Sequence, residues 1–211
     1  SEWGSPCFII PKKDQSIWFL SDLRELNKRI KRYSFPIPNI QKLLQKLEGF
    51  QWATALDLNM GYYYIKLDAN SRKLCTIILP WVTFEYNALP MGLCSSCDIF
   101  QEKMSDLMQG LEFIRTYIDD LLYITASSHD DHLTKLDKVL ERVQKAGLKI
   151  NIKKLFFCQP ELEYLGYWIT REGIMTTPQK LQAIKNIAVP KTKKELRSFI
   201  RTINYYRDMW I

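Results

Sequence analysis

The sequence has no long hydrophobic run, no low-complexity segment and no internal repeat. No apolar stretch approaches the ~18 residues that a membrane span needs, and the first residues lack a signal-peptide pattern. We therefore expect an intracellular protein that is not secreted and has no membrane partner. With 211 residues, 46% of them hydrophobic, the chain can bury a substantial core as one domain or two.

Cysteine and histidine are also scarce. Five scattered cysteines are an odd number and do not suggest a disulfide framework, which favours a reducing compartment. Cys94 and Cys97 have the spacing of zinc ligands, and His129 and His132 are the only histidines. Because no second cysteine pair accompanies them, we interpret the thiols as ordinary core or surface groups and expect no zinc site.

Acidic residues are sparse in residues 178–211, which contain only two of them. The same segment holds eight basic residues: Lys180, Lys185, Lys191, Lys193, Lys194, Arg197, Arg201 and Arg207. A second basic cluster spans residues 28–32. A basic run is often only a solvated surface, but two such clusters favour contacts with the phosphates of a nucleic acid.

Two adjacent acids, Asp119 and Asp120, lie between apolar runs at 113–114 and 121–124. Such runs are typical of buried strands, and the acids fall where one strand turns into the next. An unpaired carboxylate in apolar surroundings is costly to ionise, so it needs hydrogen bonds, a basic partner or a hard cation such as Mg²⁺. A solvated turn is the simpler interpretation. A third acid in a matching setting, Asp57, favours a functional site instead.

Capping signals and periodicity predict the local structure. Helices are expected at 99–108, 128–147, 177–190 and from 192 onward, and strands at 148–152 and 164–170. Capping boxes pair Ser128 with Asp131 and Thr192 with Glu195. Because helices and strands mix without a regular βαβ alternation, the sequence predicts an α+β fold.

Short motifs follow one another along essentially the whole chain. They include Pro11-Lys12-Lys13-Asp14, Phe35-Pro36-Ile37-Pro38, Leu89-Pro90-Met91-Gly92, Ile99-Phe100-Gln101, Tyr117-Ile118-Asp119-Asp120, Tyr164-Leu165-Gly166 and the segments 22–28, 54–62, 146–151, 195–199 and 204–207. In this order they resemble the reverse transcriptases of Ty3/gypsy-type long-terminal-repeat retrotransposons.

The resemblance implies a right-hand polymerase fold whose palm has an antiparallel sheet packed on helices. The fingers would be residues 1–33 and 65–95, interleaved with a palm of residues 34–64 and 96–176. Residues 177–211 would begin a thumb. We expect the chain to be an excised or truncated core, without the rest of the thumb and the ribonuclease H that follow in a full element.

The resemblance further implies an RNA-directed DNA polymerase, a nucleotidyltransferase that adds deoxynucleotides to a primer 3′-hydroxyl with two Mg²⁺ ions, or Mn²⁺ in their place. Its partners would be an RNA template, a DNA primer, the RNA–DNA hybrid, deoxynucleoside triphosphates and the remainder of a Pol polyprotein, including integrase. Its location would be a cytoplasmic virus-like particle or the nucleus. The alternative is a catalytically impaired remnant that only binds RNA or a hybrid duplex.

Site residues carry over one at a time. Asp57 and Asp119 match the principal metal ligands, Asp120 supports them, and the carbonyl of Leu58 completes the coordination. For the nucleotide, Lys13 or its neighbour Lys12 would reach the triphosphate. Tyr62 would exclude ribonucleotides or be a core aromatic, and Met91 would pack beside the base. The nucleic-acid contacts would come from Tyr117, Gly166, Tyr167, Trp168, Lys191, Lys193, Lys194, Arg197 and Arg201.

Four positions depart from the family pattern. Trp18 stands where relatives carry an arginine that clamps the triphosphate, and Gln15 stands for a turn glycine. Cys97 replaces the usual proline, and Arg201 replaces a glycine on the thumb helix. Intact acids with altered supports are typical of either a divergent working enzyme or an inactive copy.

Overall fold

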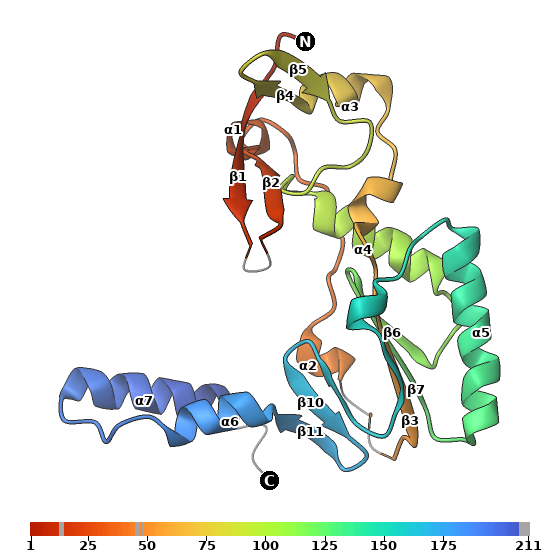
Figure 1. The fold of residues 1–211 in the computed structure, drawn as a ribbon, viewed down its shortest axis with the longest axis vertical. Coiled ribbons are helices and arrows are strands. Elements are labelled where there is room, and N and C mark those ends of the chain that lie inside the picture. Colours follow the sequence, from red (N-terminus) through yellow and green to blue (C-terminus); the bar gives the residue numbers. More distant parts are fainter. Residues whose placement is uncertain (13–14, 45–46, 48, 207–211) are drawn as a thin grey trace.

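The computed structural model describes residues 1–12, 15–44, 47 and 49–206. Its helices and strands form an elongated body with an N-terminal sheet at one end and a central sheet below it (Figure 1). A small C-terminal sheet lies beside the central one, and two helices extend from it to one side. In the described part of the chain, no helix is both long and apolar enough to span a membrane.

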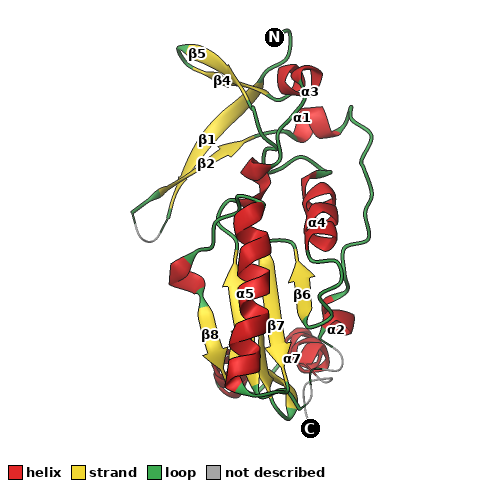
Figure 2. Cartoon of the chain, turned by 90° about the vertical axis from the view of Figure 1, so that its right-hand side faces the viewer, coloured by secondary structure: helices red, strands yellow, loops and turns green. Residues whose placement is uncertain are grey.

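The N-terminal sheet has the strand order β2-β1-β4-β5 and is built from two separate segments of the chain. The segments are β1 (Ser5–Pro11) with β2 (Ile17–Ser21), and β4 (Thr76–Leu79) with β5 (Val82–Glu85). β1 pairs antiparallel with β2 and parallel with β4. Helices α1 (Arg24–Asn27) and α3 (Ala69–Leu74) lie beside this sheet (Figure 2).

The central sheet is antiparallel, with the order β6-β7-β3-β8. Its strands are β3 (Trp52–Asp57), β6 (Ile114–Tyr117), β7 (Asp120–Thr125) and β8 (Phe156–Gln159). Helices α4 (Ser96–Leu107) and α5 (His129–Lys145) cover one face (Figure 2). The hairpin of β6 and β7 predicted around the paired acids is confirmed.

Alternating side chains of the central sheet enter two different cores, as the period of two in a strand requires. Leu56, Leu121 and Tyr123 pack against α4 and α5. Ala55 and Leu122 face the opposite side, where they meet helix α2 (Ile40–Leu43) and the C-terminal sheet. Both faces are therefore covered by apolar side chains, so the sheet is a rigid support for the residues at its edge.

The C-terminal sheet comprises β9 (Leu162–Tyr164), β10 (Tyr167–Thr170) and β11 (Gly173–Thr176), all antiparallel. Helices α6 (Pro178–Lys185) and α7 (Lys193–Tyr206) follow it. Two short 3₁₀ helices, η1 (Gly61–Tyr64) and η2 (Ile152–Lys154), flank the end of the central sheet that carries the acids.

The structure confirms the two helix starts that the capping boxes predict. The Ser128 side chain accepts a hydrogen bond from the Asp131 amide at the start of α5. At α7, the Thr192 side chain accepts from the Glu195 amide, and the Glu195 carboxylate accepts from the Thr192 amide. The bonds at α7 are reciprocal, whereas at α5 only the Ser128 half of the box forms, because the Asp131 carboxylate bonds Ser127 and Lys135. In both helices, bonds of this kind satisfy backbone donors that the first turn leaves free.

Three predicted elements are wrong in detail. Residues 148–152 make one isolated bridge, between Leu58 and Ile150, because β8 occupies the rest of the β3 edge. Ile152 is 81% exposed and begins η2. Residues 164–170 do not form one strand, because the chain turns at 165–166 between β9 and β10. Helix α6 ends at Lys185, well before Pro190.

Candidate active site

Three acidic residues lie at one end of the central sheet. Asp57 ends β3 and pairs in register with Asp120, the first residue of β7. Asp119 lies in the turn between β6 and β7, and its carbonyl accepts a hydrogen bond of 2.9 Å from the Leu58 amide. The structure thus brings together all the residues that the sequence proposed as metal ligands.

The turn that carries Asp119 is held by helix α4. Ile118 has φ +52°, a conformation that is strained for a β-branched residue. Its amide donates to the side-chain carbonyl of Gln101 over 2.7 Å, and Gln101 is fully buried. The buried bond stabilises a backbone conformation that the local sequence would not adopt alone. Gln101 belongs to a motif noted in the sequence, but its role was not predicted.

The Asp119 carboxylate is the most perturbed of the three. Burial, together with the charges of Asp120 and Asp57, raises its pKa to about 6. Among the described residues, its Oδ1 is the one buried side-chain oxygen or nitrogen without a hydrogen-bond partner. A Cβ on Gly61 would lie 2.5 Å from this oxygen and would overlap the ring of Phe100. Only glycine therefore fits at position 61.

Asp57 has hydrogen-bond partners in the segment that precedes β8. Its Oδ2 accepts from Lys154 Nζ at 2.9 Å, and its Oδ1 accepts from the Asn151 side chain at 3.2 Å. The hydrogen bond to Asp57 raises the pKa of Lys154. Burial, and then the charge of Asp57, raises the pKa of Asp120. Neither Lys154 nor Asn151 was assigned a role from the sequence, although Asn151 closes one of the motifs.

Carboxylate oxygens are the ligands that Mg²⁺ prefers, and the unpartnered Oδ1 of Asp119 is an oxygen of this kind. The donor set therefore fits a hard divalent cation in its chemistry. Within the described residues, no three acidic, histidine or cysteine side chains already stand in an arrangement ready to hold an ion. A cation at Asp57 would take the place of the Lys154 ammonium, which now supplies the positive charge.

Two of the proposed nucleotide-contacting residues, Tyr62 and Met91, pack in the core beside α4 and α5. Tyr62 is buried, with its ring 5.1 Å from that of Phe100 and its hydroxyl 3.3 Å from Cys97 Sγ. Burial and the contact with Cys97 raise its pKa. This is the environment of a core aromatic, one of the two interpretations of Tyr62. Met91 is half-buried and packs on the same core.

Of the two lysines proposed to reach the triphosphate from the N-terminal hairpin, the structure describes one. Lys13 lies outside the described residues, whereas Lys12 is exposed beside Gln15, whose φ of +64° fits the glycine expected there. Trp18 is 46% exposed on β2, opposite Ile10. It therefore packs only partly on the apolar sheet surface.

Two residues of the basic cluster at 28–32 pair with acids of the chain, and its interpretation as a phosphate-binding patch stays a prediction. The Arg32 guanidinium donates to both oxygens of the buried Asp98, and Lys28 pairs with Glu25. Arg29 stacks over the Trp3 ring at 5.4 Å. These contacts fix the chain between the N-terminal sheet and α4.

The basic residues of α7 remain available. Lys191, Lys193, Lys194, Arg197 and Arg201 are all exposed. The last three are three and four residues apart, so they share one face of the helix. The remaining proposed contacts, Tyr117, Gly166, Tyr167 and Trp168, are half-buried on β6 and the β9–β10 hairpin.

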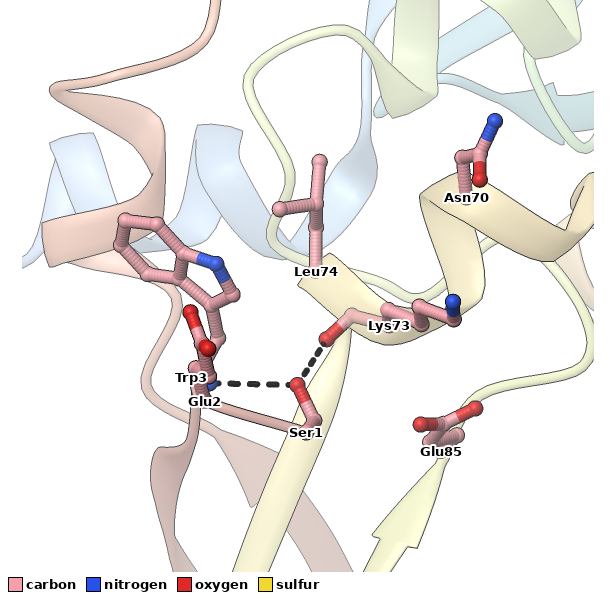
Figure 3. A pocket seen from close by; sticks show the side chains of 7 residues that line it. All are labelled: Ser1, Glu2, Trp3, Asn70, Lys73, Leu74 and Glu85. Atoms are coloured by element: carbon pink, nitrogen blue, oxygen red, sulfur yellow. Dashed lines mark hydrogen bonds between the residues drawn. The ribbon is translucent and has the colours of Figure 1, made fainter.

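Another cavity lies away from the carboxylates. It has a volume of about 530 Å³ and opens between the first residues of the chain, α3 and β5 (Figure 3). Ser1, Trp3, Lys73 and Glu85 line it. A smaller cavity of about 270 Å³ adjoins the carboxylates, with Asp57, Asp120 and Lys154 in its wall.

Comparison with known proteins agrees with this geometry. A family model described as reverse transcriptase (RNA-dependent DNA polymerase) matches residues 10–169. The retrovirus-related Pol polyprotein from transposon 297 of Drosophila melanogaster is 30% identical over 98% of this chain, and 20% of its own length is covered. The transposon Tf2-3 polyprotein of Schizosaccharomyces pombe is 29% identical over 96% of the chain, with 15% of its length covered. The chain therefore spans a fifth or less of these relatives.

Two solved structures are also similar. The foamy viral protease-reverse transcriptase dRH in complex with double-stranded DNA aligns with a TM-score of 0.86 and 25% identity, covering 97% of this chain and 36% of that one. The same viral protein with an RNA/DNA hybrid gives a TM-score of 0.82 and 25% identity over 97% of this chain and 27% of that one.

Two segments of the chain, separated by β3, build the N-terminal sheet, and the acids lie at one end of an antiparallel sheet packed on helices. This arrangement defines the right-hand polymerase class of fold. The chain belongs to the reverse transcriptase family, and its resemblance to retrotransposon Pol proteins is confirmed.

Proposed function

We propose that this chain is the core of an RNA-directed DNA polymerase. The observation that carries the proposal is the placement of Asp57, Asp119 and Asp120 together at one end of the central sheet. Asp119 there has a buried oxygen without a hydrogen-bond partner. Burial and neighbouring charge raise the pKa values of Asp119 and Asp120. Neighbouring carboxylates with raised pKa values cost folding stability and are typical of functional sites.

In the proposed reaction, the primer 3′-hydroxyl attacks the α-phosphate of a deoxynucleoside triphosphate, and pyrophosphate leaves. Asp57, Asp119, Asp120 and the Leu58 carbonyl would hold Mg²⁺, which lowers the pKa of the attacking hydroxyl and neutralises charge on the phosphates. Gln101 holds the Asp119 turn in place, and Lys154 orients Asp57.

We assign the rest of the chain to fingers, palm and thumb by its position relative to the acidic residues. Residues 1–33 and 65–95 are the proposed fingers, 34–64 and 96–176 the palm, and 177–211 the start of the thumb. Lys12 or Lys13, Tyr62 and Met91 would meet the nucleotide. The basic face of α7, Tyr117 and the β9–β10 hairpin would meet an RNA template, a DNA primer or their hybrid. By analogy with the polyprotein relatives, ribonuclease H and integrase would be covalent partners, in a cytoplasmic particle or the nucleus.

A second candidate is a duplex-binding remnant without polymerase activity. The observation that favours it is Trp18, an apolar and half-exposed side chain where relatives carry the arginine clamp. Binding would then depend on the basic face of α7 and would persist without chemistry.

Primer extension on an RNA template with Mg²⁺ separates the two candidates, with the double variant Asp57→Asn/Asp119→Asn as the reference. Extension by the parent and none by the double variant supports the polymerase. Equal duplex binding by both proteins, with no extension by either, supports the remnant.

A further inference from the structure

Helix α6 supports the turn of the β9–β10 hairpin from the side. The ammonium of Lys180 donates to the carbonyl of Gly166 over 2.6 Å. It also lies 5.9 Å from the centre of the Tyr167 ring, within the range of a cation–π contact. Lys180 is half-buried, whereas Lys185, one turn and a residue later on the same helix, is exposed.

The turn is shaped to receive this lysine. Leu165 and Gly166 have φ values of +50° and +76°, the pattern of a two-residue hairpin turn of type I′. A Cβ on Gly166 would lie 2.9 Å from Lys180 Nζ, so a larger residue would displace the ammonium. Leucine is unfavourable in this conformation, and the bond to the adjoining carbonyl supplies external support for it.

The residue just before the turn is joined to the carboxylate site. The Tyr164 hydroxyl donates to the backbone carbonyl of Asp120 over 3.0 Å, and Tyr164 itself is buried. Leu162 and Ile169 pack into the core on the same face of the central sheet. Two contacts therefore fix the hairpin: one to α6 at its turn, and one to the first residue of β7.

We propose that Lys180 is a positioning residue that sets the place of the β9–β10 turn relative to Asp120. The inference rests on the proposed function, in which this hairpin meets the template, the primer or their hybrid. The bond to the Gly166 carbonyl directs the half-buried Lys180 ammonium toward the hairpin turn, so we assign it to positioning the turn and not to binding phosphate. The bond from Lys180 to Gly166 also ties α6 to the hairpin, which Tyr164 in turn ties to Asp120.

The test compares Lys180→Met with Lys185→Met, which removes the same charge from the same helix. Three quantities are measured: kcat for primer extension, the salt dependence of duplex affinity, and hydrogen exchange of the amides of residues 165–168. We expect Lys180→Met to lower kcat about 10- to 100-fold, as misplacement of a reacting group does. Exchange at the turn should accelerate, while the log–log salt slope stays within about 0.3 of the parent value, below one phosphate contact. Lys185→Met should change neither kcat nor exchange.

A slope flattened by about 0.7 to 0.9 in Lys180→Met would make Lys180 a phosphate contact and overturn the proposal. Unchanged turn exchange would overturn it as well. Lys180→Arg retains a donor and should recover most of the lost kcat and the slow exchange, which a merely space-filling side chain would not require. If the parent extends no primer, the polymerase proposal fails, and the exchange and slope measurements still decide the Lys180 contact.

Discussion

Lys154 and Asp57 form an ion pair of 2.9 Å across 97 residues of sequence, between η2 and the end of β3. The lysine is the positive charge nearest to a group of three acids that otherwise repel one another. Asp57 is only 19% exposed at its side chain, so the pair is partly shielded from solvent. The carboxylate site is thus held together by a cation of the chain itself.

The first prediction concerns Asp119. Replacing it with Asn preserves its shape and removes the charge that the proposed ions require. We expect primer extension to fall below detection, while duplex affinity measured by fluorescence anisotropy stays within about twofold, because the basic face of α7 is untouched. Asp120→Asn should be milder, because Asp120 is the supporting ligand. Extension by Asp119→Asn near the parental rate would refute the catalytic assignment.

Tyr62 provides a test of sugar selection. If its ring limits space at the 2′ position, Tyr62→Val should lower the ratio of kcat/KM for a deoxynucleotide over its ribonucleotide about tenfold or more, because the discrimination is steric. The same change removes a buried ring packed on Phe100, so we expect a stability loss of about 2–4 kcal/mol, measured by urea unfolding. Tyr62→Phe, which keeps the ring, should retain the ratio. A constant ratio in a folded Val variant would leave Tyr62 as a core aromatic.

The exposed lysines before and at the start of α7 should set the salt dependence of binding. Replacing Lys191, Lys193 and Lys194 with Gln should weaken duplex binding for all sequences alike, and should flatten the log–log salt slope by about 0.7 to 0.9 for each phosphate that is no longer neutralised. Lys138→Gln is the control, because Lys138 is exposed on α5, remote from α7 (Figure 1). An unaltered slope in the triple variant would identify these lysines as an ordinary solvated surface.

Trp18→Arg should increase the rate of nucleotide incorporation. Arginine offers paired donors to a phosphate and stays charged at any working pH, whereas an indole has a single donor. Single-turnover incorporation should rise about tenfold or more, because such donors stabilise the charge that develops on the leaving group. Duplex affinity should remain nearly constant. Trp18→Lys separates charge from geometry, and equal rates for Trp18→Arg and the parent would show that Trp18 is not the limiting defect.

His132 should make the fold sensitive to acid. It is fully buried, its ring nitrogens lie 2.9 Å and 2.7 Å from the hydroxyls of Thr54 and Thr125, and burial lowers its pKa to about 4. The unfolded chain therefore binds a proton below about pH 6.5 that the folded chain does not. This contribution to stability is complete above that pH and is lost as the pH falls toward 4.

The measurement is the urea midpoint at a series of pH values from neutral down toward the lowered pKa of His132. His132→Gln should lower the midpoint at neutral pH, but the difference from the parent should shrink as the pH falls, since glutamine does not titrate. A constant difference across this range would contradict the assignment. Asp119 acts in the opposite direction near pH 6, because its raised pKa favours proton uptake by the folded chain, and the comparison with the variant cancels its effect.

Local signals in the sequence predicted the elements that depend on neighbours along the chain. The capping boxes at Ser128 and Thr192 and the hairpin around Asp119 require only residues within a few positions of each other. The strand expected at 148–152 failed because period-two alternation does not show which sheet edge is free, and β8 takes the edge of β3.

Interactions between distant residues could not be predicted in the same way. Gln101, Lys154 and Lys180 act on a turn amide, a carboxylate and a turn carbonyl that lie 14 to 97 residues away. Each is a common residue type in an ordinary local pattern, and only the fold brings it to its partner. For the basic cluster at 28–32, composition suggested phosphate binding, and only the fold shows that Arg32 pairs with the buried Asp98.

The strand order of the two large sheets also constrains how the chain reaches its native state. β1 pairs with β4, and β3 pairs with both β7 and β8, so neither sheet is complete until segments far downstream in the sequence have been synthesised. Such non-local pairing raises the contact order and slows folding. During translation, both edges of β3 stay unpaired until β7 has been synthesised, and one edge stays unpaired until β8 emerges. This part of the chain is therefore where a nascent copy is most exposed to aggregation.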